Sequence, residues 1–317
     1  MTEFEKRVDY FLEKQLKDWK RAGDHHAALP NVRTRTVWVD GQSRVIQFNP
    51  ERIRSSAACI HKTALQARPC FFCNRETEQE SILFDRNFEI LVNPYPIFEN
   101  HLTIPLRHHD KQQIFRYFTE MLRIAVSLPG YFVFYNGPRC GASAPDHMHF
   151  QAGKKGCLPV VNHCRDVRKI LIRAGKRTGI YRLAGYRPSV FLIVSASMEE
   201  AVSAFEQIYR ELKIKPGEYE PMMNVLVWTD DNGKWNICIF PRRELRPSCF
   251  YAEGEAKILI SPATVEMSGL FITPLEKDFR TVTATDLENI LDEVCLTGEE
   301  MDKIGRNIAE SNIEEQI

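Results

Sequence analysis

Hydrophobic residues change their spacing along the chain, and each change predicts a different element. Over residues 3–22 they recur every three or four positions, which predicts an amphipathic helix. Alternation of apolar and polar residues then replaces this period, with Asp40-Gly41 between two alternating runs. Asp-Gly in that context favours a tight turn, so we expect a β-hairpin over residues 37–48.

Beyond this hairpin, similar elements follow one another twice. In each series strands precede a helix and further strands come after it, which predicts an α+β fold with two related halves. We expect an N-terminal helix within residues 1–30, a first half over 31–179 and a second half over 180–317. The expected strands cover 88–92, 100–105, 131–135, 190–194, 223–228 and 235–240, and the expected helices are one capped by Asp110 and one over 198–213.

Three other segments complete the pattern. Residues 154–179 are rich in Lys and Arg and are interpreted as a connection between the halves. Residues 257–273 are apolar and predict β-structure, whereas residues 284–311 predict two helices.

Composition and charge exclude several classes of protein. The 317 residues include 42 Lys and Arg and 42 Asp and Glu, so the formal net charge is zero and no basic stripe indicates nucleic-acid binding. No apolar run reaches the roughly 18 residues that a membrane span needs. The first twenty residues are charged throughout, and nine scattered cysteines do not form a regular disulfide framework. We therefore expect a soluble, reduced, cytoplasmic protein, as a monomer or homodimer.

Polar residues at every second position mark the strongest candidate site. His147, His149 and Gln151 alternate with Met148 and Phe150. In a strand, the three polar side chains share one face and the two apolar ones enter the core. Neutral imidazole can attack phosphorus near pH 7, and the resulting phosphoramidate can pass its group to a second acceptor. Histidine in such a place can also be structural, but three polar side chains on one face favour a catalytic site.

A loop rich in Gly, Pro and Ser leads into this strand. Asn136, Gly137, Gly141 and Ser143 can bring an amide, backbone N–H groups and a hydroxyl to a phosphate. Gln151 can donate to a non-bridging oxygen but cannot protonate a leaving group. That chemistry favours transfer from leaving groups that are stable as anions, such as phosphate or a sugar phosphate.

A C-x-x-C pair is the candidate for a metal site. Cys70 and Cys73 have the spacing of half a structural zinc site, which needs two more nitrogen or sulfur ligands. His108 and His147 are the best placed to complete it, with His109 or His101 as substitutes for His108. Two free thiols or a redox pair are the alternatives.

These motifs resemble the transferase branch of the histidine-triad (HIT) superfamily. His147 to Gln151 is similar to its H-x-H-x-Q motif, and Asn100 to His108 is similar to the HIT strand that ends in I-P-x-x-H. The C-x-x-C segment resembles the zinc knuckle of galactose-1-phosphate uridylyltransferases. Residues 135–152, with looser matches over 240–296, are similar to GDP-L-galactose (GDP-hexose) phosphorylases.

The resemblance implies a HIT-like fold with two halves, each an antiparallel sheet packed by helices. It implies that His149 carries the nucleotidyl group, that Gln151 orients the phosphate, and that a structural zinc is bound. Its implied zinc ligands are Cys70, Cys73, His108 and His147.

Paired arginines follow a strand in the uridylyltransferases, and Arg52 and Arg54 are similarly placed here. Arg52 and Arg54 either contact substrate phosphates or are solvated surface residues. Asp146 departs from the phosphorylase pattern, which has Asn there, and the C-x-x-C belongs to the other subfamily.

The predicted function is a nucleotidyltransferase or phosphorylase that cleaves a nucleoside diphosphate sugar, with GDP-hexose as the first choice. Phosphate or a sugar phosphate accepts the nucleotidyl group. The alternatives are a dinucleoside polyphosphate (Ap4A-type) phosphorylase or adenylyltransferase, and a non-catalytic nucleotide-binding protein. A hydrolase is disfavoured because Gln151 stands where HIT hydrolases have a third histidine, and a DNA-repair deadenylase because the charge is neutral.

Overall fold

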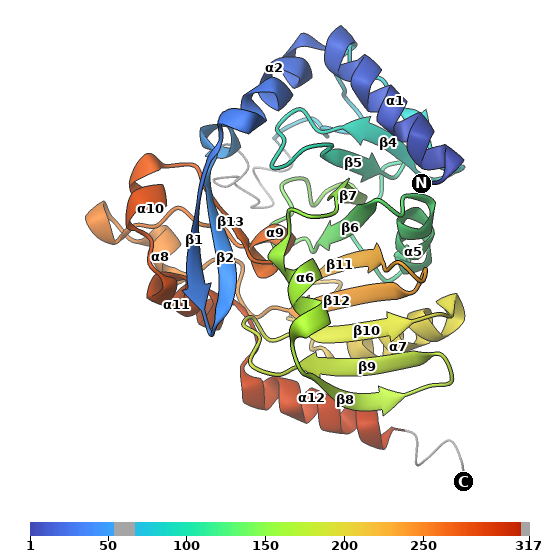
Figure 1. Cartoon of the computed structure of the whole chain (residues 1–317), viewed down its shortest axis with the longest axis vertical. Helices are drawn as coiled ribbons and strands as arrows, with labels where there is room; N and C mark the ends of the chain where they lie inside the picture. Colours follow the sequence, from blue (N-terminus) through green and yellow to red (C-terminus); the bar gives the residue numbers. More distant parts are fainter. Residues whose placement is uncertain (54–66, 312–317) are drawn as a thin grey trace.

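A single long antiparallel sheet dominates the computed structural model, which describes residues 1–53 and 67–311. All nine of its named ladders between neighbouring strands are antiparallel, and the order across the sheet is β3-β4-β5-β7-β6-β11-β12-β10-β9-β8 (Figure 1). Its strands are β3 (Ile82–Leu83), β4 (Glu89–Val92), β5 (Leu102–Pro105), β6 (Tyr131–Asn136), β7 (His149–Lys154), β8 (Lys169–Ala174), β9 (Thr178–Leu183), β10 (Phe191–Ser195), β11 (Met223–Thr229) and β12 (Trp235–Pro241).

Helices and a second, three-stranded sheet surround it. In that small sheet β13 pairs in parallel with β2, which also pairs with β1 in the expected hairpin. These strands are β1 (Arg33–Val39), β2 (Gln42–Phe48) and β13 (Leu270–Thr273). The helices are α1 (Glu3–Asp18), α2 (Lys20–Ala28), α5 (Phe118–Ser127), α6 (Pro159–Asp166), α7 (Met198–Glu211), α8 (Ser248–Tyr251), α9 (Thr264–Met267), α10 (Glu276–Thr281), α11 (Ala284–Val294) and α12 (Gly298–Glu310), with short 3₁₀ turns η1 (Leu29–Asn31), η2 (Pro50–Arg52) and η3 (Gly254–Ala256).

Two sets of strands with the same internal order share this sheet. The first half has the strand order β4-β5-β7-β6 with α5 between β5 and β6, and the second has β9-β10-β12-β11 with α7 between β10 and β11. They meet where β6 pairs with β11. Phe134 pairs there with Leu226, and the next strand outward places Gln151 beside Phe134 and Cys238 beside Leu226. Cys238 is therefore the counterpart of Gln151, and the predicted fold class is confirmed.

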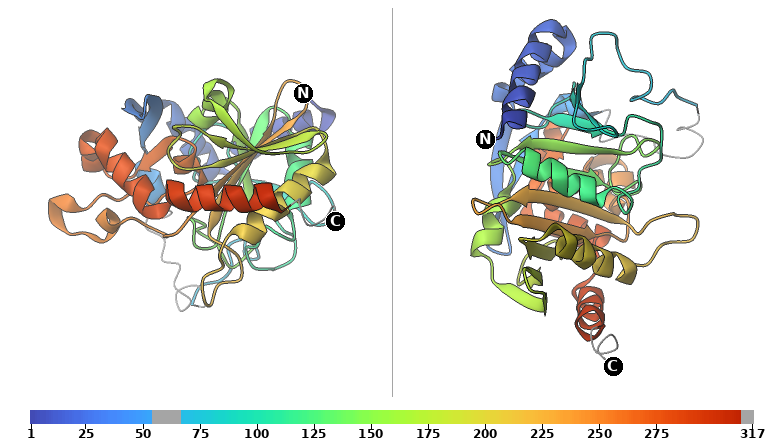
Figure 2. Two further views of the ribbon diagram at one scale, coloured as in Figure 1. Left: turned by 90° about the horizontal axis from the view of Figure 1, so that it is seen from below. Right: turned by 90° about the vertical axis from the view of Figure 1, so that its right-hand side faces the viewer.

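Each face of the long sheet has its own apolar core. On one face side chains of α1, α5, α7 and α12 pack against the sheet, whereas on the other face α6, α11 and the small sheet do so. The two orthogonal views of Figure 2 show the helices α5 and α7 lying along one side of the strands. Met148 and Phe150 enter the first core, as predicted, so His149 and Gln151 face the small sheet.

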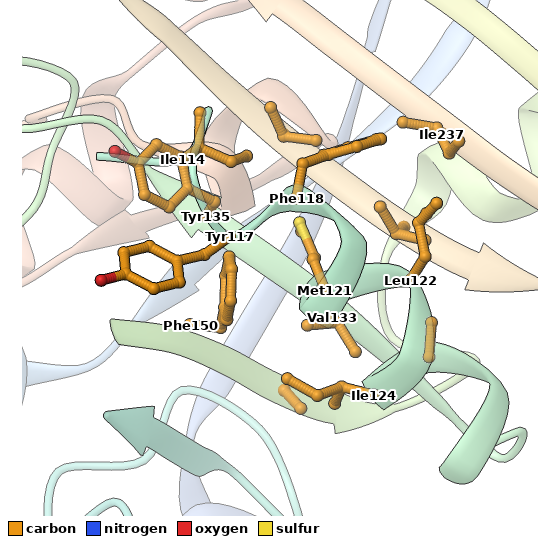
Figure 3. Packing of buried hydrophobic residues seen from close by; sticks show 14 of the residues in the cluster. Ile114, Tyr117, Phe118, Met121, Leu122, Ile124, Val133, Tyr135, Phe150 and Ile237 are labelled. Atoms are coloured by element: carbon orange, nitrogen blue, oxygen red, sulfur yellow. The ribbon is translucent and has the colours of Figure 1, made fainter. Parts of the chain in front are cut away.

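The helix α5 shows how the sequence builds the first core. Its buried residues, among them Phe118, Met121 and Leu122, recur at helical spacing. Figure 3 shows these side chains in one cluster with Val133 and Phe150 of the sheet, with Phe118 extending towards Ile237. Burying a side chain of this size contributes about 1.5–3 kcal/mol. This packing fixes β6 and β7, which carry the candidate site.

Several expected elements differ from the observed ones. The first helix ends at Asp18, because Trp19 is extended and its indole donates to Glu76, and α2 then follows. Asp110 does not cap α5, which starts at Phe118; its carboxylate accepts from Arg116 and Tyr117 instead.

Two larger segments were also misjudged. The expected connection contains α6, β8 and β9, so the sheet extends further than predicted. Within residues 257–273 only β13 is a strand, and α9 precedes it, since a run of buried apolar residues does not by itself distinguish strand from helix. The two C-terminal helices are confirmed as α11 and α12. Among the described residues, none of the helices has the length and apolar character needed to cross a membrane.

Candidate active site and metal centre

Two cysteines and two histidines gather beside the start of β7. Cys70, Cys73, His109 and His147 place one ligand atom each within 4.8 Å of the others. The Cys70 Sγ atom lies 3.2 Å from Nδ1 of His147, and Cys73 Sγ lies 3.4 Å from Nδ1 of His109. Tetrahedral zinc bonded to sulfur and nitrogen brings such atoms to about 3.6 Å from each other. The donor set and its spacing therefore fit a structural zinc ion.

The partner of the second ring nitrogen supports this fit. Nε2 of His147 lies 2.7 Å from the carbonyl oxygen of Leu106, so Nε2 carries the proton and Nδ1 keeps its lone pair for the metal. Burial lowers the pKa of His147, which keeps this ring neutral as a ligand must be. A metal here would link the Cys70–Cys73 turn to the start of β7.

His109, and not His108, joins the two thiols. β5 ends at Pro105, and both histidines are exposed on the turn that follows. In this turn the side chain of His109 is the one directed at Cys73. The ligand expected at His108 is thus corrected to the neighbouring residue, which sequence spacing could not separate from it.

The ring of His149 is held with one nitrogen available. Its Nδ1 lies 2.9 Å from the carbonyl oxygen of His147, which places the ring proton on Nδ1. Nε2 therefore keeps a lone pair for attack. The ring of Phe72, from the turn between the two cysteines, packs on both histidine rings, at 4.9 Å from that of His149.

Burial, more than any charge, sets the protonation of this ring. His149 is buried at 3% exposure, and this burial lowers its pKa to about 4. The bond to the His147 carbonyl opposes the shift but does not cancel it. The imidazole is thus neutral at physiological pH, as a nucleophile must be.

Gln112 holds the backbone of His149 from both sides. Its Oε1 atom accepts the N–H of His149 at 2.8 Å, and its Nε2 donates to the carbonyl oxygens of His149 and Asn136, each at 3.0 Å. Gln112 is fully buried, so these bonds replace water completely. It follows the β5 turn without a regular period, so the sequence offered no signal for this role.

A chain of hydrogen bonds orients Gln151. The N–H of Ile97 donates to Nδ1 of His101, so the ring proton lies on Nε2, which is 2.9 Å from Oε1 of Gln151. The amide oxygen of Gln151 is thereby occupied, and its NH₂ group is the end left for a ligand. His101 was considered for the metal; the structure instead places it behind Gln151.

The loop before β7 uses part of the predicted phosphate-binding set internally. Oδ1 of Asn136 accepts from Asn224 and from the N–H and hydroxyl of Thr264, so only its NH₂ group remains to meet a ligand. Gly137 donates its N–H to the carbonyl of Met223 at 3.2 Å, and this N–H is not available for a phosphate. Its role is corrected: a Cβ atom there would lie 2.7 Å from the same oxygen, so Gly137 permits close strand contact.

Of the remaining predicted residues, the structure describes Ser143 and Arg52. Ser143 is partly buried in the loop, two residues after Gly141, which has φ +90° and packs against Ala263. Arg52 donates to the Tyr95 carbonyl at 2.7 Å, and burial lowers its pKa to about 10, so it stays charged. Its charge also contributes to lowering the pKa of His101, so it lies on the Gln151 side of the site. Arg54 lies outside the described residues.

Arg242 supports the loop from behind. It is 4% exposed, and its guanidinium donates to Oδ1 of Asn224 at 2.7 Å and to four backbone carbonyls. Asn224 in turn donates to Asn136 and to the carbonyl of Cys140. The sequence marked Arg242 only through the C-terminal resemblance, and no local pattern predicted this network.

The second half has no histidine at the position that corresponds to His149. Asn236 stands two residues before Cys238 in β12, where His149 stands before Gln151 in β7. Its Nδ2 atom donates to the carbonyl of Lys234, two residues back, much as the His149 ring bonds to that of His147. An amide is not a nucleophile toward phosphorus, so of these two positions only that of His149 holds a candidate nucleophile.

Comparison with known proteins gives two family matches and a fold. Residues 11–154 match the model "Domain of unknown function (DUF4922)", and residues 163–314 match the model "GDPGP1-like, C-terminal domain". Each model covers slightly less than half of the chain. Curated protein sequences give no match.

Among solved structures, the chain is similar to yeast Ap4A phosphorylase Apa2. The TM-score is 0.60 at 16% sequence identity, covering 90% of this chain and 96% of the yeast chain. The complex of that enzyme with Ap4A gives the same TM-score at 15% identity, covering 92% and 97%. The chain has a HIT-like fold. At this identity the likeness establishes the fold, and the chemistry must be argued from the site.

Proposed function

We propose that this protein is a phosphorylase that cleaves a nucleoside diphosphate sugar through a covalent nucleotidyl-His149, with GDP-hexose as the first choice of substrate. The observation that carries the proposal is the state of the His149 ring. It is neutral, its Nδ1 is bonded to the His147 carbonyl, and its Nε2 is available beside the amide of Gln151.

The first displacement follows from this geometry. Nε2 of His149 attacks the α-phosphorus, an N–P bond forms, and the bond to the bridging oxygen breaks. The hexose 1-phosphate leaves as an anion with the electron pair of that bond. The imidazole becomes positively charged, and the His147 carbonyl that accepts from Nδ1–H stabilises the charge.

The second displacement restores the enzyme. An oxygen of inorganic phosphate attacks the same phosphorus, the N–P bond breaks, and the nucleoside diphosphate leaves. Gln151 donates to a non-bridging oxygen in both transition states but carries no acidic proton for the leaving group. A weakly basic leaving group is therefore required, which favours a phosphate or sugar phosphate over a sugar hydroxyl.

Other donors around the nucleophile hold the phosphates in the proposed complex. The NH₂ group of Asn136 and the hydroxyl of Ser143 serve on the loop side, and Arg52 serves on the Gln151 side. The loop is braced internally by Asn224, so its donors are preorganised before the substrate binds. A zinc ion at Cys70, Cys73, His109 and His147 would brace the start of β7 and take no part in the displacements.

Two observations bear on the nucleotide. The C-terminal half matches the GDPGP1-like model, which favours a GDP-hexose. The similarity of the fold to a structure of yeast Ap4A phosphorylase favours a dinucleoside polyphosphate as the second candidate. Both substrates present an α-phosphorus to the same nucleophile, so the mechanism is common to them.

Trapping the covalent intermediate tests the proposal. The protein is incubated, without phosphate, with α-³²P-labelled GDP-, UDP- and ADP-sugars and with labelled Ap4A. We expect acid-labile label on the protein from a GDP-sugar, and its release as GDP when phosphate is added. Label from Ap4A alone would support the second candidate, and no label from any nucleotide would support a non-catalytic binding protein.

A matched pair of variants identifies the labelled residue. His149→Ala should give no label and no turnover, whereas His108→Ala, on the exposed turn, should label normally. Phosphorolysis by His149→Ala within tenfold of the wild-type rate would refute the mechanism.

A further inference from the structure

Arg44 is a fully buried cation without an anionic partner. It lies in β2 with 0% exposure. Its guanidinium donates to the carbonyls of Ser43 and Arg187 and to the side-chain oxygen of Gln42, all of which are neutral. Among the described residues, no carboxylate forms an ion pair with it. A buried charge costs several kcal/mol unless an opposite charge accompanies it.

Three buried polar atoms without hydrogen-bond partners lie in the same cluster. They are Nε of Arg44, the hydroxyl of Tyr186 and Nδ1 of His163. The Arg44 guanidinium lies 4.9 Å from the centre of the Tyr186 ring, and the Tyr186 and His163 rings are 6.1 Å apart. Only four such atoms occur in the part of the chain that the structure describes, and three of them are here.

The chemistry of these atoms selects the ligand. Nε–H of arginine can only donate, and the tyrosine hydroxyl is a donor as well. Nε2 of His163 lies 3.4 Å from the Ser43 hydroxyl; when that hydroxyl donates, the ring proton is on Nδ1, which becomes a third donor. The carboxylate that acts on His163 is that of Asp166, which is exposed. Its effect on the pKa of His163 is smaller than the effects of burial and of Arg44. The face of the Tyr186 ring attracts the Arg44 cation only in part, and donors around a cation that has no carboxylate partner among the described residues favour an anion.

The position of the cluster in the fold supports a ligand site. Tyr186 packs in the same apolar core as Cys164 and Cys238, and Cys238 is the counterpart of Gln151. Both thiols also act on the pKa of Tyr186, so the cluster lies near Cys238, the counterpart of Gln151 in the first half. Asn236 stands there in place of His149, whereas β2, α6 and the segment before β10 supply donors and a positive charge.

We propose that Arg44, Tyr186 and His163 hold a small inorganic anion between β2, α6 and the segment before β10. The anion compensates the Arg44 charge and joins β2 and α6 to the segment before β10. Its role is to stabilise the fold, independently of the reaction at His149. Chloride is the probe of choice, because phosphate also serves the proposed reaction.

Thermal unfolding tests the site. The wild-type protein, freed of phosphate and nucleotide, is unfolded in sodium chloride and in sodium gluconate of equal ionic strength. We expect the Tm to be higher in chloride by about 2–4 °C when the site is mostly filled. Tyr186→Phe removes only a hydroxyl without a protein partner, so this variant should fold and lose most of the chloride effect. Tyr251→Phe, at an exposed position, should keep it.

A crystal soaked in sodium bromide gives an independent readout. The expected result is an anomalous peak within hydrogen-bond distance of Nε of Arg44 in the wild type and none there in Tyr186→Phe. Equal chloride effects in the wild type and in Tyr186→Phe would overturn the proposal. So would bromide peaks confined to the surface of the molecule.

Discussion

Nε2 of His101 lies 2.9 Å from the amide oxygen of Gln151, and this bond leaves the NH₂ end of the amide free for a ligand. If His101 is replaced by Phe, the bond is lost and Gln151 is free to rotate. We expect the rate of phosphorolysis to fall about 10- to 100-fold, the effect of slight misplacement of a catalytic group.

A double-mutant cycle separates this positioning role from a structural one. In the Gln151→Ala background, His101→Phe should cost little more, because its effect acts through the amide that is already absent. Additive losses in the double mutant would show that His101 acts in another way.

The hydrogen bonds between Gln112 and the backbone of His149 and Asn136 give a second prediction. Gln112→Glu keeps the shape of the side chain but sets a carboxylate oxygen against the carbonyls of His149 and Asn136. We expect a loss of about 2–4 kcal/mol in the free energy of unfolding, measured with urea, and a lower rate of nucleotidylation. The neighbouring Gln113→Glu is the control, because Gln113 is only partly buried and its bond to the backbone is long, at 3.4 Å to the carbonyl of Tyr219. Equal losses in the two variants would contradict this role of Gln112.

The low pKa of His149 predicts a specific dependence on pH. The folded ring has a pKa of about 4, against about 6.5 in the unfolded chain, so the unfolded state binds more protons between these values. This group therefore reduces stability as the pH falls from about 6.5 towards 4, and it has no effect above 6.5. The free energy of unfolding of His149→Gln, minus that of the wild type, should therefore increase as the pH falls through this window.

The same pKa governs the chemistry. Between about pH 5.5 and 7 the nucleophile stays neutral, so the single-turnover rate of label transfer should lose less than half its value through this group. A rate that falls with an apparent pKa near 6.5 would mean that the ring is as exposed as a free imidazole.

Metal content distinguishes the two neighbouring histidines. The purified protein should hold about one equivalent of zinc. His109→Ala should weaken zinc binding more than about 100-fold, the upper range for loss of an outer partner, whereas His108→Ala should not change it. Chelator titration followed by emission of a zinc indicator measures both. Weaker binding in the His108 variant would restore the assignment made from sequence.

Arg242 provides a prediction on stability. Lysine has the charge but not the planar set of donors, so Arg242→Lys leaves several buried carbonyls without a partner. We expect the free energy of unfolding to fall by about 2–4 kcal/mol. Arg243→Lys should cost much less, because Arg243 also bonds to backbone carbonyls but is nearer to the solvent.

The local pattern of the sequence determined much of this protein. Alternation placed His149 and Gln151 on one face with Phe150 on the other, and the strand-helix-strand order appeared twice. Such patterns are reliable because they depend on the side chains of consecutive residues in one element. The C-x-x-C pair likewise predicted half of the candidate metal site.

Only the tertiary structure decided which distant residues complete these patterns. His109 instead of His108, His101 behind Gln151 and Gln112 around His149 all come from turns, whose side-chain directions follow from packing and not from a period. The joining of two sheets into one also arises from long-range pairing between β6 and β11. Local spacing fixes the face on which a side chain lies, whereas its partner is set by contacts between segments far apart in the chain.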